Sequence, residues 1–194
     1  MTIKKVCVYC ASSRQSDSVY HHAAAALGRI LAHHSISIVY GGGSVGSMGS
    51  LADAALAEGG LVVGVIPRFM YELEWGHRCL TKMLIVDDLR ERTRLMLEEA
   101  DAVIALPGGC GTLDELFEAI TLKRLGCFLK PIVMINVQRF FDPCILLLES
   151  CIREKFMSER HRSMWSVVEK PDDVVDAIRN APPWDISARD FAAL

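Results

Sequence analysis

The strongest chemical signal in the sequence is a glycine-rich turn followed, one helical turn later, by an acidic residue. Residues 107–112 (PGGCGT) lie between a short apolar run and an amphipathic stretch, and Glu115 comes just after them. Glycines at the start of a helix let backbone N–H groups approach an anion closely, and the hydroxyl of Thr112 adds a further donor. The turn therefore predicts a phosphate site. No Gly-Lys-Ser/Thr triplet is present, so nucleoside triphosphate hydrolysis is not indicated.

Thr112 and Glu115 also fit a purely structural pattern. Thr-x-x-Glu is a capping box, in which the Glu side chain bonds back to the start of its own helix. A Glu that caps its helix is turned away from a ligand, so the two interpretations exclude each other. The residue pattern alone leaves both open.

A second glycine loop, residues 41–46 (GGGSVG), formally matches G-x-G-x-x-G between a strand and a helix. A dinucleotide fingerprint needs this motif after the first strand and an acidic residue near the end of the next one. Here the motif follows the second expected strand, and the third ends in Ile-Pro-Arg at residues 66–68. An NAD site is therefore not expected, whereas part of another nucleotide pocket is.

The charged segment 87–94 (DDLRERTR) has a simple structural explanation as the solvated face of a helix with i,i+4 ion pairs. That explanation suits Arg90, Glu91 and Arg94. The pattern alone does not separate Arg92 from these neighbours. Further upstream, the apolar residues of 68–85 could line a ligand pocket or a subunit interface, and the pattern does not decide between the two.

Short apolar runs alternate with amphipathic stretches along the whole chain. This alternation predicts an α/β fold, doubly wound, with a mostly parallel sheet and helices on both faces. Ligands bind such sheets at the carboxyl ends of the strands, where the loops 11–13, 41–49 and 107–115 fall. We expect one catalytic domain over 1–181 and a tail over 182–194. The expected strands are 6–9, 36–40, 61–66, 83–86, 102–106 and 132–135, and the expected helices are 17–33, 48–58, 88–99, 112–125, 140–156 and 172–180.

Composition limits the partners. The 194 residues are 51% hydrophobic and 23% charged, and their net charge of −3 gives no electrostatic basis for binding nucleic acid. No apolar run is long enough to span a membrane, and the N-terminal one is too short for a signal peptide, so we expect a cytoplasmic protein. Its seven cysteines are scattered and interpreted as reduced thiols. No His-rich or carboxylate-rich cluster suggests a metal.

Three segments together resemble one known family. Residues 107–115 (PGGCGTLDE) are similar to the PGGxGTxxE motif of the LOG family of cytokinin-activating phosphoribohydrolases. Residues 41–49 (GGGSVGSMG) resemble its GGGxxGxMG loop, and residues 8–13 (VYCASS) resemble its CGSS turn. The resemblance covers about residues 4–156. It implies a Rossmann-like fold, a homodimer, and hydrolysis of an N6-modified adenosine 5′-monophosphate to free base and ribose 5-phosphate, without a metal or organic cofactor.

The resemblance also assigns residues. The family's HxRK stretch falls on residues 90–93, so its Arg corresponds to Arg92, while its His and Lys are replaced by Arg90 and Thr93. Arg92 and Glu115 are the implied catalytic residues. The glutamate assigned upstream is Glu74, with Glu72 as the alternative register. The implied substrate-binding residues are Ser12, Gly43, Met48, Glu74, Thr93, Gly109, Cys110, Gly111, Thr112 and Thr121.

These residue types suit cleavage of an N-glycosidic bond. Such a reaction builds positive charge on the ribose, which a carboxylate stabilises, and the guanidinium of Arg92 would hold Glu115 ionised. Two alternatives remain: an AMP nucleosidase with no cytokinin role, and a non-catalytic nucleotide-binding module. A pyridoxal-dependent lysine decarboxylase is not expected, because none of the three loops contains a lysine to form the Schiff base.

Overall fold

The computed structural model describes residues 2–73 and 75–192 and shows one seven-stranded, all-parallel sheet. Its strand order is β4-β3-β2-β1-β5-β6-β7, so the chain builds outward from β1 and then returns to add β5 on the other side. The predicted α/β class is confirmed, and the order reverses between β1 and β5. The strands are β1 Lys5–Tyr9, β2 Ser37–Tyr40, β3 Val62–Pro67, β4 Lys82–Val86, β5 Ala102–Ala105, β6 Ile132–Ile135 and β7 Ser166–Val168.

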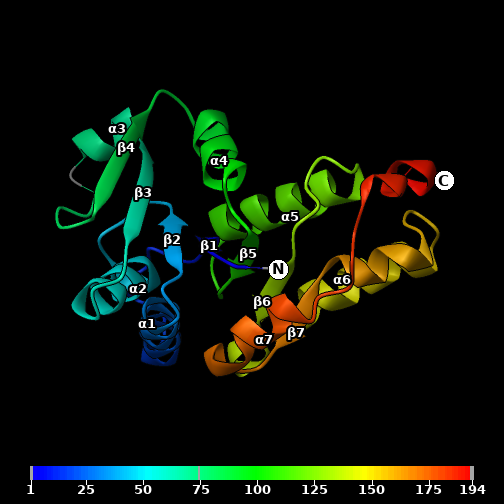
Figure 1. Cartoon of the computed structure of the whole chain (residues 1–194), viewed down its shortest axis with the longest axis horizontal. Coiled ribbons are helices and arrows are strands. Elements are labelled where there is room, and N and C mark those ends of the chain that lie inside the picture. Colours follow the sequence, from blue (N-terminus) through cyan, green and yellow to red (C-terminus); the bar gives the residue numbers. More distant parts are fainter. Residues whose placement is uncertain (1, 74, 193–194) are drawn as a thin grey trace.

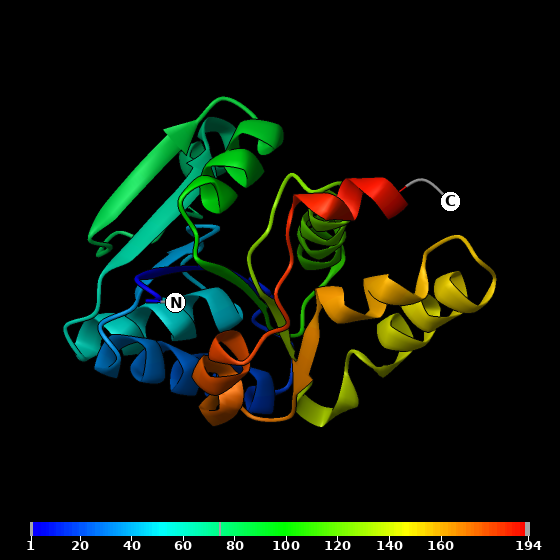
Figure 2. The same cartoon turned by 45° about the vertical axis from the view of Figure 1, so that its right-hand side comes forward.

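Helices cover both faces of the sheet (Figures 1 and 2). Side chains of α1, α2 and α7 pack on one face, and those of α4, α5 and α6 pack on the other. Successive strand residues alternate between the two cores, so the central strands are buried on both sides and are apolar after the first residues of β1 and β2, Lys5 and Ser37. The helices are α1 Ser18–His33, α2 Gly46–Ala57, α3 Arg68–Glu72, α4 Leu89–Glu98, α5 Cys110–Arg124, α6 Asp142–Arg153 and α7 Val174–Arg179.

One strand and one α-helix were not predicted from the sequence. β7 has only three residues at the edge of the sheet, and α3 has five residues and buries none of them. Neither is long enough to show a clear hydrophobic period. α5 also begins two residues earlier than expected, with Gly109 as its N-cap, so most of the glycine turn belongs to the helix start.

The pair α1 and α2 depends on one small residue. A Cβ added to Gly28 would lie 2.3 Å from the carbonyl oxygen of Leu51 on α2, so only glycine allows the two helices this approach. The α2 helix follows the second glycine loop directly in the sequence.

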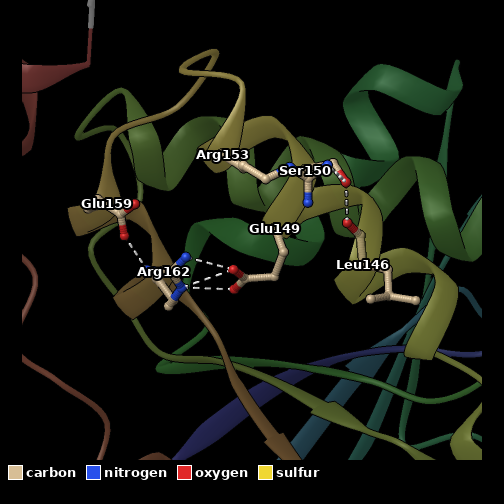
Figure 3. Close-up of polar contacts among 6 residues, drawn as sticks. All are labelled: Leu146, Glu149, Ser150, Arg153, Glu159 and Arg162. Carbon is tan, nitrogen blue, oxygen red and sulfur yellow. Dashed lines mark hydrogen bonds and ion pairs between the residues drawn. The ribbon is translucent and has the colours of Figure 1, made fainter.

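The chain after β6 continues the sheet with β7 and packs helices on both of its faces. Its short helix η2 (Glu159–Met164) is joined to α6 by Arg162, which contacts Glu149 and Glu159. The Nη2–Oε2 distance to Glu149 is 2.6 Å, and Figure 3 shows Arg162 lying between the two carboxylates. Further along, the indole Nε1 of Trp184 donates to the carbonyl oxygen of Lys123 at 2.8 Å. Residues 182–192 thus lie against the end of α5, and the division at residue 181 stays a prediction.

No helix in the described part of the chain is both long and apolar enough to cross a membrane. Within residues 2–73 and 75–192, no three His, Cys, Asp or Glu side chains are grouped so that they could hold a metal ion.

Candidate active site

A cavity of about 640 Å³ opens at the carboxyl ends of the central strands. The three loops singled out in the sequence all line it, since they follow β1, β2 and β5, which are neighbours in the sheet. Arg92 on α4 and Glu115 on α5 complete the polar part of the wall. The parallel topology therefore gathers segments that lie up to a hundred residues apart in the sequence.

The loop after β2 and the turn after β1 are packed directly on each other. Gly46 has a φ of +62°, and a Cβ there would lie 2.4 Å from the carbonyl oxygen of Ser13. The backbone N–H of Met48 donates to the carbonyl oxygen of Ala11 at 3.0 Å. These contacts make one continuous wall from two loops, with Ser12, Gly43 and Met48 all facing the cavity.

The start of α5 is an open cradle. Gly109 is its N-cap, and no side chain caps the helix. A Cβ added at Gly109 or at Gly111 would meet no heavy atom within 4 Å, and both residues line the cavity. Gly108 is different, because a Cβ there would lie 2.1 Å from Oγ1 of Thr112. The first N–H groups of the helix are thus left for an anion in the cavity.

Glu115 does not form the capping box that its spacing allowed. Its Oε1 instead accepts a hydrogen bond from Nη1 of Arg92 at 2.8 Å, and both side chains are buried. Thr112 is the third helical residue rather than the N-cap. The capping alternative is therefore excluded, and Glu115 is held toward the cavity.

Arg92 is fixed by the ends of two strands as well as by Glu115. Its Nε donates to the carbonyl oxygen of Val65 at 3.1 Å, and Nη2 donates to that of Gly41 at 3.4 Å. A Cβ on Gly41 would lie 1.9 Å from Nη2, so the first glycine of the loop makes room for the guanidinium. Every nitrogen of Arg92 has a partner, and its orientation follows from the backbone of β3 and the 41–49 loop.

Burial raises the pKa of Glu115 to about 7. The charge of Arg92 lowers the pKa, and the nearby carboxylates of Asp114 and Glu118 raise it. A carboxyl group whose pKa lies near neutral pH can accept and return a proton at physiological pH. Glu115 can therefore act as a general acid or base, and in its ionised form it can stabilise a positive charge in the cavity.

The other predicted residues lie in different places. Thr93 is buried on α4, and its hydroxyl donates to the carbonyl oxygen of Leu89 at 3.0 Å, so it does not reach the cavity of this chain. Cys110 is exposed at the first position of α5, and Thr121 is exposed further along that helix. Glu74 lies outside the described residues. The roles of these residues stay predictions.

Several lining residues were not identified from the sequence. Met70 and Trp75 form part of the wall beyond the glycine loop, and Arg14 lies beside the serines of the first turn. The segment 68–85 has no clear period, so its apolar residues could not be divided in advance between pocket and surface. The structure divides them: Met70 and Trp75 face the cavity, whereas Phe69, Tyr71 and Leu73 are exposed and do not line it.

Comparisons with known proteins find relatives that match most of the chain. The model of a family described as "possible lysine decarboxylase" matches residues 48–178. A cytokinin riboside 5′-monophosphate phosphoribohydrolase of Rhodococcoides fascians is 39% identical over 180 residues, which cover 92% of this chain and 91% of the relative. One from Arabidopsis thaliana is 37% identical over 169 residues, covering 87% of this chain and 78% of the relative.

A solved structure shares the fold at low identity. The Moco carrier protein from Chlamydomonas reinhardtii superposes with a TM-score of 0.70 at 18% sequence identity, over 93% of this chain and 98% of that one. At this identity the similarity concerns the fold alone, and the same architecture evidently supports more than one function.

Proposed function

Because the chain belongs to the LOG family of phosphoribohydrolases, we propose that it hydrolyses the base–ribose bond of an adenosine 5′-monophosphate, with or without an N6 substituent, to the free base and ribose 5-phosphate. The observation that carries the proposal is the buried Arg92–Glu115 pair, which lies in the same cavity as the open start of α5. No metal or organic cofactor is part of the proposed mechanism.

The cradle at the start of α5 and the Arg92–Glu115 pair contact different parts of the nucleotide. The 5′-phosphate binds at the start of α5, on the N–H groups beside Gly109 and Gly111 and on the hydroxyl of Thr112. Glu115 lies one helical turn further along, where the ribose of such a nucleotide would lie. Binding energy from the phosphate, which does not react, thereby positions the sugar against the carboxylate.

The reaction itself needs one water molecule. As the bond from C1′ to the base nitrogen breaks, its electron pair goes to the base and positive charge builds on the ribose ring. The carboxylate of Glu115 stabilises that charge and accepts a proton from the attacking water, whose oxygen bonds to C1′. The same proton then passes to the departing base. Arg92 holds Glu115 in place and favours its ionised form before the water attacks.

The two alternatives differ in what they leave unexplained. An AMP nucleosidase would use the same site and differ only in the base it accepts. A non-catalytic binding module would need the cradle but has no use for a buried carboxyl group with a pKa near 7 beside a fixed guanidinium. Perturbed carboxyl groups in a cleft are typical of catalytic sites, and this favours the enzyme.

We further infer that the protein is cytoplasmic and acts as a homodimer without nucleic acid. All seven cysteines are free thiols, as in proteins of reducing compartments. The homodimer follows from the family resemblance, and light scattering during size-exclusion chromatography would test it. The net charge of −3 argues against a nucleic-acid partner.

The proposed activity is tested by incubating the purified protein with AMP, with isopentenyladenosine 5′-monophosphate, and with adenosine as the control without phosphate. Free base is quantified by chromatography. We expect release of base from at least one of the two monophosphates and almost none from adenosine, because adenosine cannot use the cradle. Tight binding of both monophosphates with no release of base would favour the binding module instead.

A further inference from the structure

The positions of the cradle and the catalytic pair fix the direction in which the nucleotide must lie, and this inference rests on the proposed function. The phosphate end lies at the start of α5, directly after β5. Arg92 reaches from Glu115 toward the ends of β3 and β2, where it contacts Val65 and Gly41. In the sheet, β2 and β3 lie on the opposite side of β1 from β5. A nucleotide that starts at the cradle therefore places its base over the β2 and β3 side of the cavity.

That side of the cavity is largely apolar. The side chains of Met48, Ile66, Met70 and Trp75 line it. The nearby Ser44 is already engaged, because its N–H and its hydroxyl both donate to the carbonyl oxygen of Trp75, at 3.1 and 3.3 Å. This wall can contact the face of a base, but it has few free polar groups that could hydrogen-bond to the edges of the base.

Trp75 is held in place although half of it is exposed. Its neighbour Gly76 pairs with Gly43 in an antiparallel bridge, and the next N–H, that of His77, donates to the carbonyl oxygen of Gly42 at 2.9 Å. His77 is buried and lies 2.9 Å from a carboxylate oxygen of Asp53 on α2. The backbone around Trp75 is thus attached to the same glycine loop that forms the cavity wall, and the residue as a whole is 54% exposed.

We propose that Trp75 is the platform on which the base stacks, with Met70 and Met48 completing the contact. Aromatic stacking suits any flat base and grows with the area covered, and methionine side chains adapt to irregular shapes. The site therefore takes purine nucleoside 5′-monophosphates, prefers them to pyrimidine ones, and discriminates little among substituents on the purine. Selection of the base comes from this wall, and selection of the monophosphate comes from the cradle.

The test compares a ligand that has a base with one that lacks it. We expect Trp75→Ala to weaken the binding of AMP by about 5- to 150-fold, the range that corresponds to one stacked base, with a much smaller effect for Trp75→Phe. The binding of ribose 5-phosphate, which occupies the cradle only, should stay within about twofold. Isothermal titration calorimetry measures both in the Glu115→Gln background, so that AMP is not hydrolysed during the titration. Unchanged AMP binding in Trp75→Ala, or an equal loss for both ligands, would overturn the proposal.

A second measurement does not depend on the stability of the alanine variant. The chain has three tryptophans, and Trp165 and Trp184 do not line the cavity. AMP should change the intrinsic fluorescence of the wild type and of the control Trp184→Phe, and this change should disappear in Trp75→Phe. A change that persists in Trp75→Phe would contradict the stacking. Because both measurements record binding, they remain informative even if no base is released and the proposed hydrolysis is wrong.

Discussion

At the scale of single residues, the properties of Glu115 result from opposing influences. Burial and two neighbouring carboxylates raise its pKa, and Arg92 lowers it, so that the pKa lies near 7. The sequence pointed to Glu115 through its motif but allowed it to be a helix cap. Arg92 could not be separated from Arg90 and Arg94 by its pattern, because all three fit a solvated helix. Only the family resemblance singled it out, since its partners come from other elements of the fold.

The pH dependence of the reaction follows from that pKa. Below pH 7 Glu115 is protonated and cannot accept a proton, so kcat/KM should rise about tenfold per pH unit up to about pH 7 and then level off. The measurement is kcat/KM for AMP between pH 5 and 9. A profile that stays flat across this range would contradict the role of Glu115 as a base.

The phosphate of AMP also titrates near pH 6, and the variant Glu118→Gln separates the two effects. Glu118 raises the pKa of Glu115 through its charge, and it does not line the cavity. Neutralising Glu118 should lower the pKa of Glu115 and so move the rising limb of the kcat/KM profile to lower pH. A limb that belonged to the substrate would stay where it is.

At the scale of elements, the glycines of the two loops and helices serve different purposes. Gly41 and Gly28 are needed because atoms of the protein occupy the space where a side chain would be, whereas Gly109 and Gly111 face open space. The long elements of the fold were predictable, because their apolar period extends over many residues. The positions of β7 and α3 were not, since three and five residues show no reliable period.

The variant Gly111→Ala tests the cradle. Gly111 lies in the first turn of α5, and a Cβ there meets no protein atom, so the melting temperature should stay the same or rise slightly. The added methyl group would project into the cradle and should weaken inhibition by ribose 5-phosphate by about tenfold or more. Inhibition constants and thermal unfolding provide the two readouts.

Gly28→Ala is the matched control for this variant. Its Cβ would approach the carbonyl oxygen of Leu51 to 2.3 Å, and neither residue lines the cavity, so the variant should lower the melting temperature and leave the inhibition constant unchanged. If Gly111→Ala binds ribose 5-phosphate as well as the wild type, the phosphate is not bound at the start of α5.

At the scale of the whole molecule, the site exists because of the order of the strands. The glycine loops are 58 residues or more apart in the sequence, and they meet because β2, β1 and β5 are adjacent in the sheet. Alternating apolar runs predict the fold class but not this order, which depends on packing between elements far apart in the chain. The same holds for the wall at Trp75, whose position depends on a bridge between Gly76 and Gly43.

The most direct test of the central claim measures turnover and binding together in Glu115→Gln. The glutamine keeps an oxygen to accept from Arg92 but can neither take a proton nor face the ribose with a negative charge. We predict that release of base from AMP falls by about 10²–10⁴-fold or more, while AMP binds within severalfold of the wild-type affinity and the protein stays folded. Turnover close to that of the wild type in a folded Glu115→Gln variant would contradict the account.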